Sequence, residues 1–190
     1  MVAAFYDEVY KKSPGKWSDH DRDRFAFEAI HRILGEPESL LDFGCGNGHT
    51  LEYFRRKWSR TILFGYDISP EAVKIASKKV DAALSTQVPE EKVEIVTCLG
   101  VAEHFEKADL SPLRLGAYLY LEVPNCLSYS DSSVEGFRAT HGGSGQMEWH
   151  LKRKTWHDLI EKAGFEIVES LTGGRPSWEF VWIARQKGIA

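Results

Sequence analysis

Cysteine is scarce in this sequence, which has only Cys45, Cys98 and Cys126. Their spacing matches no pattern of paired metal ligands, and an odd number cannot form a complete set of intramolecular disulfides. Reduced cysteines are typical of the cytoplasm, so we expect a cytoplasmic protein.

Long apolar segments are also missing. No run approaches the roughly 20 residues that a helix needs to cross a bilayer. Polar residues occur within the first ten positions, where a signal peptide would begin its apolar core. We therefore expect a soluble, intracellular chain with no membrane span.

An excess of positive charge is the third absence. The chain has 24 basic and 28 acidic residues, a formal charge of −4, and its isoelectric point is near 6.0. Proteins that bind nucleic acids neutralise phosphates with clustered basic residues. The charge balance therefore predicts no nucleic-acid partner.

What the sequence does contain is an alternation of apolar runs and helical periodicity. Its 190 residues, 43% of them hydrophobic, suit one domain with a sizeable core. Helical spacing or capping signals predict helices at 18–35, after Gly48, at 69–79 and at 156–163, and a short helical segment is expected at 105–115. Apolar or β-branched runs predict strands at 39–43, 61–67, 81–87, 92–100, 117–123, 165–168 and 180–184. This order predicts an α/β domain with a mainly parallel sheet, closed by a hairpin of the last two strands.

A glycine-rich turn follows the first predicted strand. Gly44, Gly46 and Gly48 lack a Cβ, so the backbone can turn sharply into a helix and approach a ligand. Asp67 ends the second strand, where an acidic side chain can accept hydrogen bonds from ribose hydroxyls. The combination favours a nucleotide-like ligand, although a tight turn without a ligand would use the same glycines. The GxGxG spacing differs from the GxGxxG of dinucleotide dehydrogenases, and no second mononucleotide-binding half follows.

Three segments resemble the successive motifs of class I S-adenosylmethionine-dependent methyltransferases. They are residues 41–48 (LDFGCGNG), 65–73 (GYDISPEAV) and 97–105 (TCLGVAEHF). The similarity is greatest to the small-molecule group that includes quinone-biosynthesis methyltransferases, and it continues through 118–125 and 156–168. It implies a Rossmann-like sheet of seven strands, mainly parallel with an antiparallel last strand and helices on both faces. It also implies methyl transfer from S-adenosylmethionine to an oxygen, carbon or nitrogen atom of a small-molecule acceptor, with S-adenosylhomocysteine as the product.

The resemblance also implies an organisation of the chain as a single methyltransferase domain. Residues 1–36 would form an N-terminal helical cap, 37–125 the cofactor-binding half and 153–190 a C-terminal helix and β-hairpin. The segment 126–152 between them would be a lid-like loop, since residues 126–146 are rich in Ser and Gly and predict a long irregular connection.

The same resemblance assigns the cofactor's parts to residues. The glycines would pass beneath the methionine part, Asp42 would orient its amino group, Asp67 would hold the ribose and Ile68 would pack against the adenine. Cys45 would be the small residue that fits between two glycines. Leu99 and Gly100 of the fourth strand would close the pocket. The implied cofactor-binding set is Asp42, Gly44, Cys45, Gly46, Gly48, Asp67, Ile68, Leu99 and Gly100.

Two further parts of the cofactor site are less defined. The group usually has an acidic residue near the adenine amino group, and here Gln87 occupies that region. Its side-chain carbonyl could accept the same hydrogen bond, or it could be a solvated loop residue. At the N-terminus, Tyr10 and Trp17 could face the sulfonium with an aromatic ring, or their segment could simply pack on the body of the domain.

Candidate catalytic residues are histidines, because a hydroxyl acceptor benefits from a base whose pKa is near the working pH. His104 follows the fourth strand, and His141 and His150 belong to the long connection, with Gln146 and Glu148 beside them. Each could instead be structural. Methyl transfer from a sulfonium needs mainly alignment and exclusion of water, so no metal is required.

Alternative functions differ in class. The missing acidic residue after the third strand and the short helix before the fifth would also suit a non-catalytic module that binds the cofactor or a partner. An amino-methylating DNA enzyme is disfavoured because its Asn/Asp-Pro-Pro-Tyr/Phe motif is absent. A metal-dependent catechol methyltransferase is disfavoured because no acidic triad is evident, and we predict no metal site.

Overall fold

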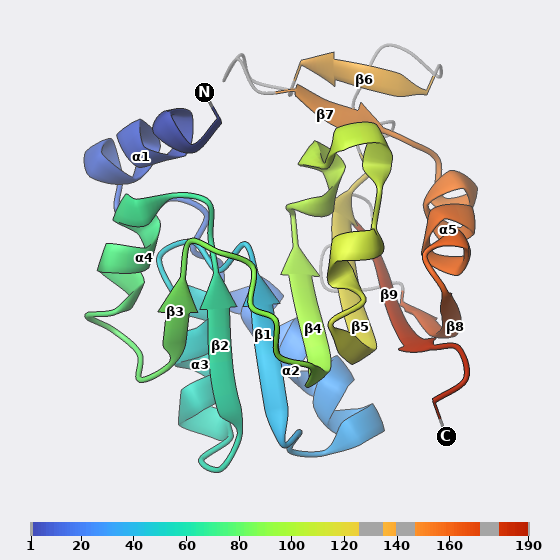
Figure 1. The fold of residues 1–190 in the computed structure, drawn as a ribbon, viewed down its shortest axis with the longest axis horizontal. Coiled ribbons are helices and arrows are strands. Elements are labelled where there is room, and N and C mark those ends of the chain that lie inside the picture. Colours follow the sequence, from blue (N-terminus) through green and yellow to red (C-terminus); the bar gives the residue numbers. More distant parts are fainter. Residues whose placement is uncertain (1, 126–134, 140–146, 172–178, 190) are drawn as a thin grey trace. The chain divides into compact units, whose positions relative to one another are not determined.

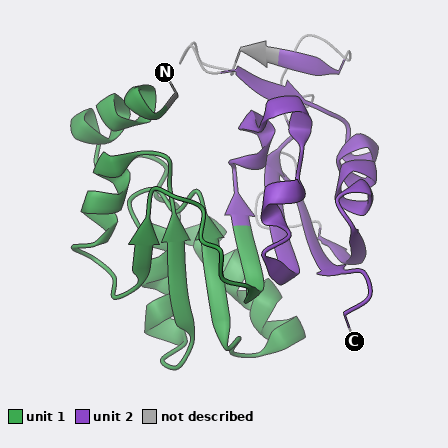
Figure 2. Cartoon of the chain, in the orientation of Figure 1, with its two compact units in different colours: residues 1–97 green, residues 98–190 purple. Residues whose placement is uncertain are grey.

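The computed structural model describes residues 2–125, 135–139, 147–171 and 179–189 (Figure 1). His141 and Gln146 lie outside these ranges. The chain divides into two compact units, Met1–Thr97 and Cys98–Ala190, which are coloured separately in Figure 2. Each unit is described by itself below.

The described residues of the first unit form four helices and most of the parallel strands. Its helices are α1 (Val2–Lys12), α2 (His20–Leu34), α3 (His49–Lys57) and α4 (Pro70–Ala76). Its strands are β1 (Ser39–Phe43), β2 (Ile62–Tyr66), β3 (Ala83–Ser85) and β4 (Val93–Leu99), of which the last two residues belong to the second unit. β1 pairs in parallel with both β2 and β4, and β2 pairs in parallel with β3. The predicted βαβ arrangement is therefore confirmed.

Local sequence explains where these helices begin. The Asp19 side chain accepts hydrogen bonds from the backbone N of Asp21 and Arg22 and so caps α2. Ser69 caps α4 in the same way, ahead of Pro70 at the first helical position. α4 ends at Ala76, three residues before the predicted end at 79, and Lys78 and Lys79 continue the chain as a turn.

The second unit contains the antiparallel strands. It comprises β5 (Gly116–Pro124), β6 (Gly136–Ala139), β7 (Met147–His150), α5 (Arg153–Lys162), β8 (Phe165–Leu171) and β9 (Glu179–Gln186). β9 is antiparallel to both β5 and β8, so the predicted C-terminal hairpin is confirmed. Along the whole chain, the seven-stranded sheet has the order β3-β2-β1-β4-β5-β9-β8, and the predicted fold class is confirmed.

Two predictions about the connections are wrong. The segment 105–115 forms no α-helix. It contains two short 3-10 helices, η2 (Glu106–Ala108) and η3 (Ser111–Leu113), and a third, η1 (Ala102–His104), precedes it. Positive φ angles at Lys107 and Ala108 interrupt the helical path there. The connection predicted to be irregular over 126–146 contains strand β6, which pairs antiparallel with β7. The rings of Phe137 and Trp149 lie opposite each other in this pair, with centroids 5.1 Å apart.

The buried core of each unit comes from the apolar runs. Leu40, Leu41 and Ile95 are fully buried in the first unit, and Tyr120, Trp156 and Trp182 are fully buried in the second. Among the described residues, no helix has both the length and the apolar character that crossing a membrane requires.

Candidate functional site

The glycine loop (residues 44–48) connects β1 to α3 at the carboxyl end of β1 (Figure 1). Gly44, Gly46 and Gly48 have φ angles of 85°, 52° and 77°, in the region that favours glycine. A Cβ on Gly48 would also lie 2.8 Å from the Cβ of Ala76 on α4. The backbone N of Gly44 donates to the carbonyl of Tyr66 at 2.7 Å, which ties the loop to the end of β2. The glycines are therefore required by backbone conformation and by packing.

Asp67 lies directly against this loop. Its Oδ2 accepts a hydrogen bond from the Gly46 backbone N at 2.8 Å, and its Oδ1 accepts one from the Ser69 backbone N at 2.9 Å. Burial raises the pKa of the Asp67 carboxyl, and the two backbone donors oppose that effect. With 8% of its surface exposed, the side chain is fixed at the carboxyl ends of two neighbouring strands.

Asp42 is a second buried carboxylate in the same unit. It lies opposite Thr97 in the pairing of β1 with β4, and the Thr97 hydroxyl donates to Asp42 Oδ1 at 2.8 Å. Burial raises the pKa of Asp42 to about 7. Near neutral pH this group can therefore exist in either protonation state.

Tyr10 of α1 packs against the glycine loop. Its side chain is 5% exposed, and its hydroxyl occupies the space that a Cβ on Gly46 would need. Its ring also contacts Trp17 at a centroid distance of 5.6 Å, and Trp17 itself is 42% exposed. Burial raises the pKa of the Tyr10 hydroxyl, so it stays neutral. Tyr10 is thus at the loop, whereas Trp17 borders it from the solvent side of Tyr10.

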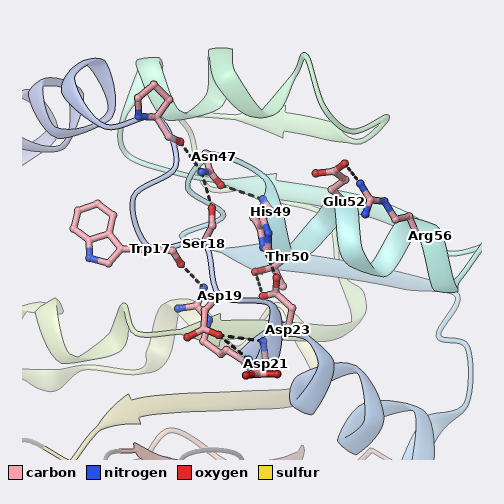
Figure 3. Close-up of polar contacts among 12 residues, drawn as sticks. Trp17, Ser18, Asp19, Asp21, Asp23, Asn47, His49, Thr50, Glu52 and Arg56 are labelled. Atoms are coloured by element: carbon pink, nitrogen blue, oxygen red, sulfur yellow. Dashed lines mark hydrogen bonds and ion pairs between the residues drawn. The ribbon is translucent and has the colours of Figure 1, made fainter.

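Sequence reasoning missed a polar network that fixes the start of α3 (Figure 3). The buried carboxylate of Asp23 on α2 accepts hydrogen bonds from the Thr50 hydroxyl at 2.8 Å and pairs with His49 Nδ1. Asn47 in the glycine loop donates to the Ser18 hydroxyl at 3.0 Å. The contributing residues are separated by more than twenty positions in sequence, so no local spacing could reveal the network.

Other predicted cofactor residues differ in exposure. Ile68 is 41% exposed, and Gln87 is also exposed, with its backbone N bonded to the Ser85 hydroxyl at 2.9 Å. Cys45 is buried, and burial raises the pKa of its thiol, which disfavours the nucleophilic thiolate. In the second unit, Gly100 has a φ of 66° and donates its backbone N to the carbonyl of Glu122 at 2.9 Å. Leu99 is buried.

Two of the three predicted catalytic histidines come together in the second unit. His104 lies in η1, and His150 ends β7. A hydrogen bond between His104 Nδ1 and the carbonyl of Met147, at 2.8 Å, joins η1 to β7. Trp149 Nε1 donates to the carbonyl of Phe105 at 3.0 Å and strengthens the same junction. His150 is 3% exposed. His104 and His150 therefore both lie close to Glu148, and His141 lies outside the described ranges.

This fold and these residues define a class of protein. An α/β sheet with a glycine loop after one parallel strand and a buried carboxylate after its neighbour is the arrangement that binds nucleotide-like ligands at the carboxyl edge. A family model described as a methyltransferase domain matches residues 18–170, and the chain belongs to this methyltransferase family. The resemblance inferred from the sequence motifs is confirmed at the level of the family.

Individual relatives agree with this assignment. The chain is 29% identical over 115 residues to a trans-aconitate 2-methyltransferase of Mycobacterium tuberculosis (strain ATCC 25177 / H37Ra), covering 54% of the chain and 44% of that protein. It is 30% identical over 120 residues to the Mycobacterium marinum (strain ATCC BAA-535 / M) protein of the same name, covering 57% and 45%. The match thus spans less than half the length of these relatives.

Solved structures share the fold. One is the 1,6-didemethyltoxoflavin-N1-methyltransferase of Burkholderia thailandensis with bound 1,6-didemethyltoxoflavin and S-adenosylhomocysteine, at a TM-score of 0.74 and 18% identity. The alignment covers 97% of this chain and 87% of that one. Another is the magnesium protoporphyrin IX methyltransferase of Synechocystis PCC 6803 with bound S-adenosylmethionine, at a TM-score of 0.70 and 16% identity, covering 98% and 95%. At these identities the likeness establishes the fold.

Proposed function

We propose that this protein binds S-adenosylmethionine and transfers its methyl group to a small molecule, releasing S-adenosylhomocysteine. The observation that carries the proposal is the geometry of Asp67, a buried carboxylate bonded to the backbone of Gly46 in the glycine loop. A carboxylate at the end of the second strand is placed to accept hydrogen bonds from both ribose hydroxyls. The named relatives and fold neighbours, several of them crystallised with this cofactor or its product, support the same assignment.

The chain's own residues would divide the binding of the cofactor. Gly44, Gly46 and Gly48 would let the backbone approach its methionine part, Asp42 would orient the amino group and Asp67 would hold the ribose. Cys45 would fill the space between two glycines, and Tyr10 would cover the loop from α1. We further propose adenine contacts with Ile68 and Gln87, pocket closure by Leu99 and Gly100, and an aromatic wall at Trp17.

The protein's contribution to the reaction would be alignment and exclusion of water, because the sulfonium donor is already activated. We assign the acceptor side to His104 and His150, and to His141 as a candidate from the long connection. His104 Nδ1 faces the Met147 carbonyl at 2.8 Å, so its Nε2 is the nitrogen that can accept a proton from the acceptor. Residues 1–36 would act as a cap and 126–152 as a lid over the acceptor.

The test is detection of a methylated product. Purified protein is incubated with isotopically methyl-labelled S-adenosylmethionine, first with trans-aconitate, because relatives carry that name, and then with a small-molecule extract. Label transferred to a small molecule, with stoichiometric S-adenosylhomocysteine, supports the proposal. Tight cofactor binding with no transfer to any extract would favour the non-catalytic module instead.

We also propose a cytoplasmic location and no nucleic-acid partner. The formal charge of −4 supports the second statement, since phosphate backbones are bound by excess positive charge. Retention of the protein on immobilised duplex DNA or RNA at physiological salt would argue against it.

A further inference from the structure

Four side chains with metal-binding atoms gather in the second unit, outside the glycine loop. Glu103 and His104 belong to η1, and Glu148 and His150 belong to β7. One ligand atom from each of Glu103, His104 and Glu148 lies within 4.8 Å of the other two. His150 Nε2 lies 3.2 Å from Glu148 Oε1. We call these four residues the Glu-His cluster.

Burial makes the charges of this cluster costly. The exposed fractions are 2% for Glu103, 7% for Glu148 and 3% for His150. Two ionised carboxylates at such a short separation repel each other, and the repulsion grows as water is excluded. A cation bound between these oxygens would relieve the repulsion.

The hydrogen bond of His104 leaves one nitrogen available as a ligand. A backbone carbonyl only accepts hydrogen bonds, so His104 Nδ1, 2.8 Å from the Met147 carbonyl, carries the proton. In the neutral ring, Nε2 then has an exposed lone pair, and this atom is 3.9 Å from Glu103 Oε1. In metal-binding histidines, the ring nitrogen that does not bind the metal usually donates a hydrogen bond, often to a backbone carbonyl, and this bond orients the ring.

His150 provides an independent observation. Neither of its ring nitrogens makes a hydrogen bond within the described part of the chain, although the side chain is buried. Its Nε2 is close to Glu148 Oε1 but is not aligned with it as a donor. Two atoms bound to one cation at about 2.1 Å each lie about 3.4 Å apart when tetrahedral. The 3.2 Å separation fits two ligands side by side on one cation.

We propose that Glu103, His104, Glu148 and His150 bind one divalent transition-metal cation. Two imidazoles with two carboxylates favour zinc, manganese or iron over magnesium and calcium, which prefer all-oxygen ligands. This proposal replaces our prediction from the sequence that no metal is bound, and with the cation bound His104 Nε2 would be a metal ligand in place of a proton acceptor. The four ligands come in two segments more than forty residues apart, and only the packing of η1 against β7 joins them.

The position of the cluster suggests what the cation would do. η1 directly follows β4, at the carboxyl edge where ligands of such sheets bind. If the proposed methyltransferase function holds, on which this part rests, the cation would hold an acceptor through a hydroxyl or carboxylate oxygen. It would lower the pKa of a bound hydroxyl, as metals do for bound water.

Cobalt titration tests the site without cofactor or acceptor, so its failure is separate from failure of the proposed function. Tag-free protein, stripped with a chelator and desalted, is titrated with Co²⁺ alone while its visible d–d absorption is recorded. We expect saturation at about one Co²⁺ per chain, and Glu148→Gln and His150→Gln should each weaken binding at least about tenfold.

A matched control is available on α5. His157, Asp158 and Glu161 also lie within 4.8 Å of one another, but Asp158 and Glu161 are exposed and His157 is only partly buried. His157→Gln should therefore bind Co²⁺ as the wild type does. Glu103→Gln, from the other segment, replaces Glu148→Gln if circular dichroism shows that the latter is unfolded. Absence of d–d bands in the wild type, or unchanged binding in all folded cluster variants, would overturn the proposal.

Discussion

Gly46 is the residue at which the glycine loop meets α1. Its φ of 52° strains any other residue, and the Tyr10 hydroxyl occupies the position of an added Cβ. Gly46→Ala should therefore lower the free energy of unfolding by about 2–4 kcal/mol, from the left-handed conformation and from overpacking together. Denaturant unfolding measures this difference.

A second variant separates the two causes. Adding Tyr10→Phe removes the oxygen that meets the new Cβ. The double variant should therefore regain the free energy of unfolding lost to overpacking, but not the free energy lost to the left-handed conformation. Gly15→Ala is the control, since nothing lies within 4 Å of a Cβ there. Equal losses for Gly15→Ala and Gly46→Ala would contradict the close packing of Tyr10 on the loop.

Asp42 gives the protein a pH dependence of stability. Burial raises its pKa to about 7 in the folded protein, against about 3.9 in an unfolded chain. The folded state therefore binds the proton more tightly. The stability that protonated Asp42 contributes to the folded state is fully present below about pH 4 and is lost as the pH rises towards 7. The loss should be on the order of 2–4 kcal/mol.

Asp42→Asn keeps an acceptor for the Thr97 hydroxyl but cannot ionise. Urea unfolding at about pH 5 and about pH 8 should show wild-type stability falling with pH, and a smaller fall in the variant. Asp67, whose pKa is also raised, contributes in the same direction in both proteins and cancels from the comparison. Identical pH dependence in the two proteins would show that Asp42 is not the buried acid we describe.

At this scale, spacing revealed Asp67 and the glycines but missed the network of Asp23. A residue that ends a strand next to a glycine turn is recognisable because both features are local. The partners of Asp23 on α3 are 26 and 27 residues away, and only helix packing brings them together.

Among the elements, α1 lies beside α4 (Figure 1), and Asp7 of α1 bonds to the start of α4. Asp7 Oδ1 accepts hydrogen bonds from the Ser69 hydroxyl and from the Glu71 backbone N, at 2.5 and 3.1 Å. A carboxylate at a helix N-terminus satisfies an otherwise unpaired N–H and interacts favourably with the helix dipole. Asp7→Ala should therefore cost about 0.5–2 kcal/mol and increase amide hydrogen exchange in α1. Glu8→Ala, which loses only an exposed ion pair with Lys11, should leave that exchange nearly unchanged.

The contact between α2 and α3 depends on Asp23. Its fully buried carboxylate joins His49 and Thr50 (Figure 3), so removing it leaves both partners without their acceptor. Asp23→Ala should lower the free energy of unfolding by about 3–5 kcal/mol. The exposed Asp21, paired with Arg24, provides the control, and Asp21→Ala should change it by less than about 0.5 kcal/mol. Similar values for the two would mean that the network contributes nothing to stability.

Capping signals predicted helix starts well, because Asp19 and Ser69 act on backbone groups within three residues. They did not predict the 3-10 turns between β4 and β5, where positive φ angles at Lys107 and Ala108 interrupt the helical path. Strands β6 and β7 were not predicted, because each has only four residues and they pair with each other.

For the whole molecule, the continuous apolar runs of the parallel strands and the C-terminal hairpin were sufficient to predict the sheet. The family match over residues 18–170 agrees with that prediction. The Glu-His cluster could not be predicted in this way, because it depends on how η1 and β7 pack. Local patterns thus indicated the strand ends that form the candidate site. Clusters of side chains from distant segments were found only in the structure.

Isothermal titration calorimetry with S-adenosylhomocysteine tests the central claim most directly, because binding of the product needs neither acceptor nor metal. We expect the wild type to bind one equivalent, Asp67→Ala to bind at least about tenfold more weakly through loss of hydrogen bonds to a charged group, and the exposed Asp81→Ala to bind normally. Absence of binding to the folded wild type, or unchanged affinity in Asp67→Ala, would contradict a cofactor site at the glycine loop.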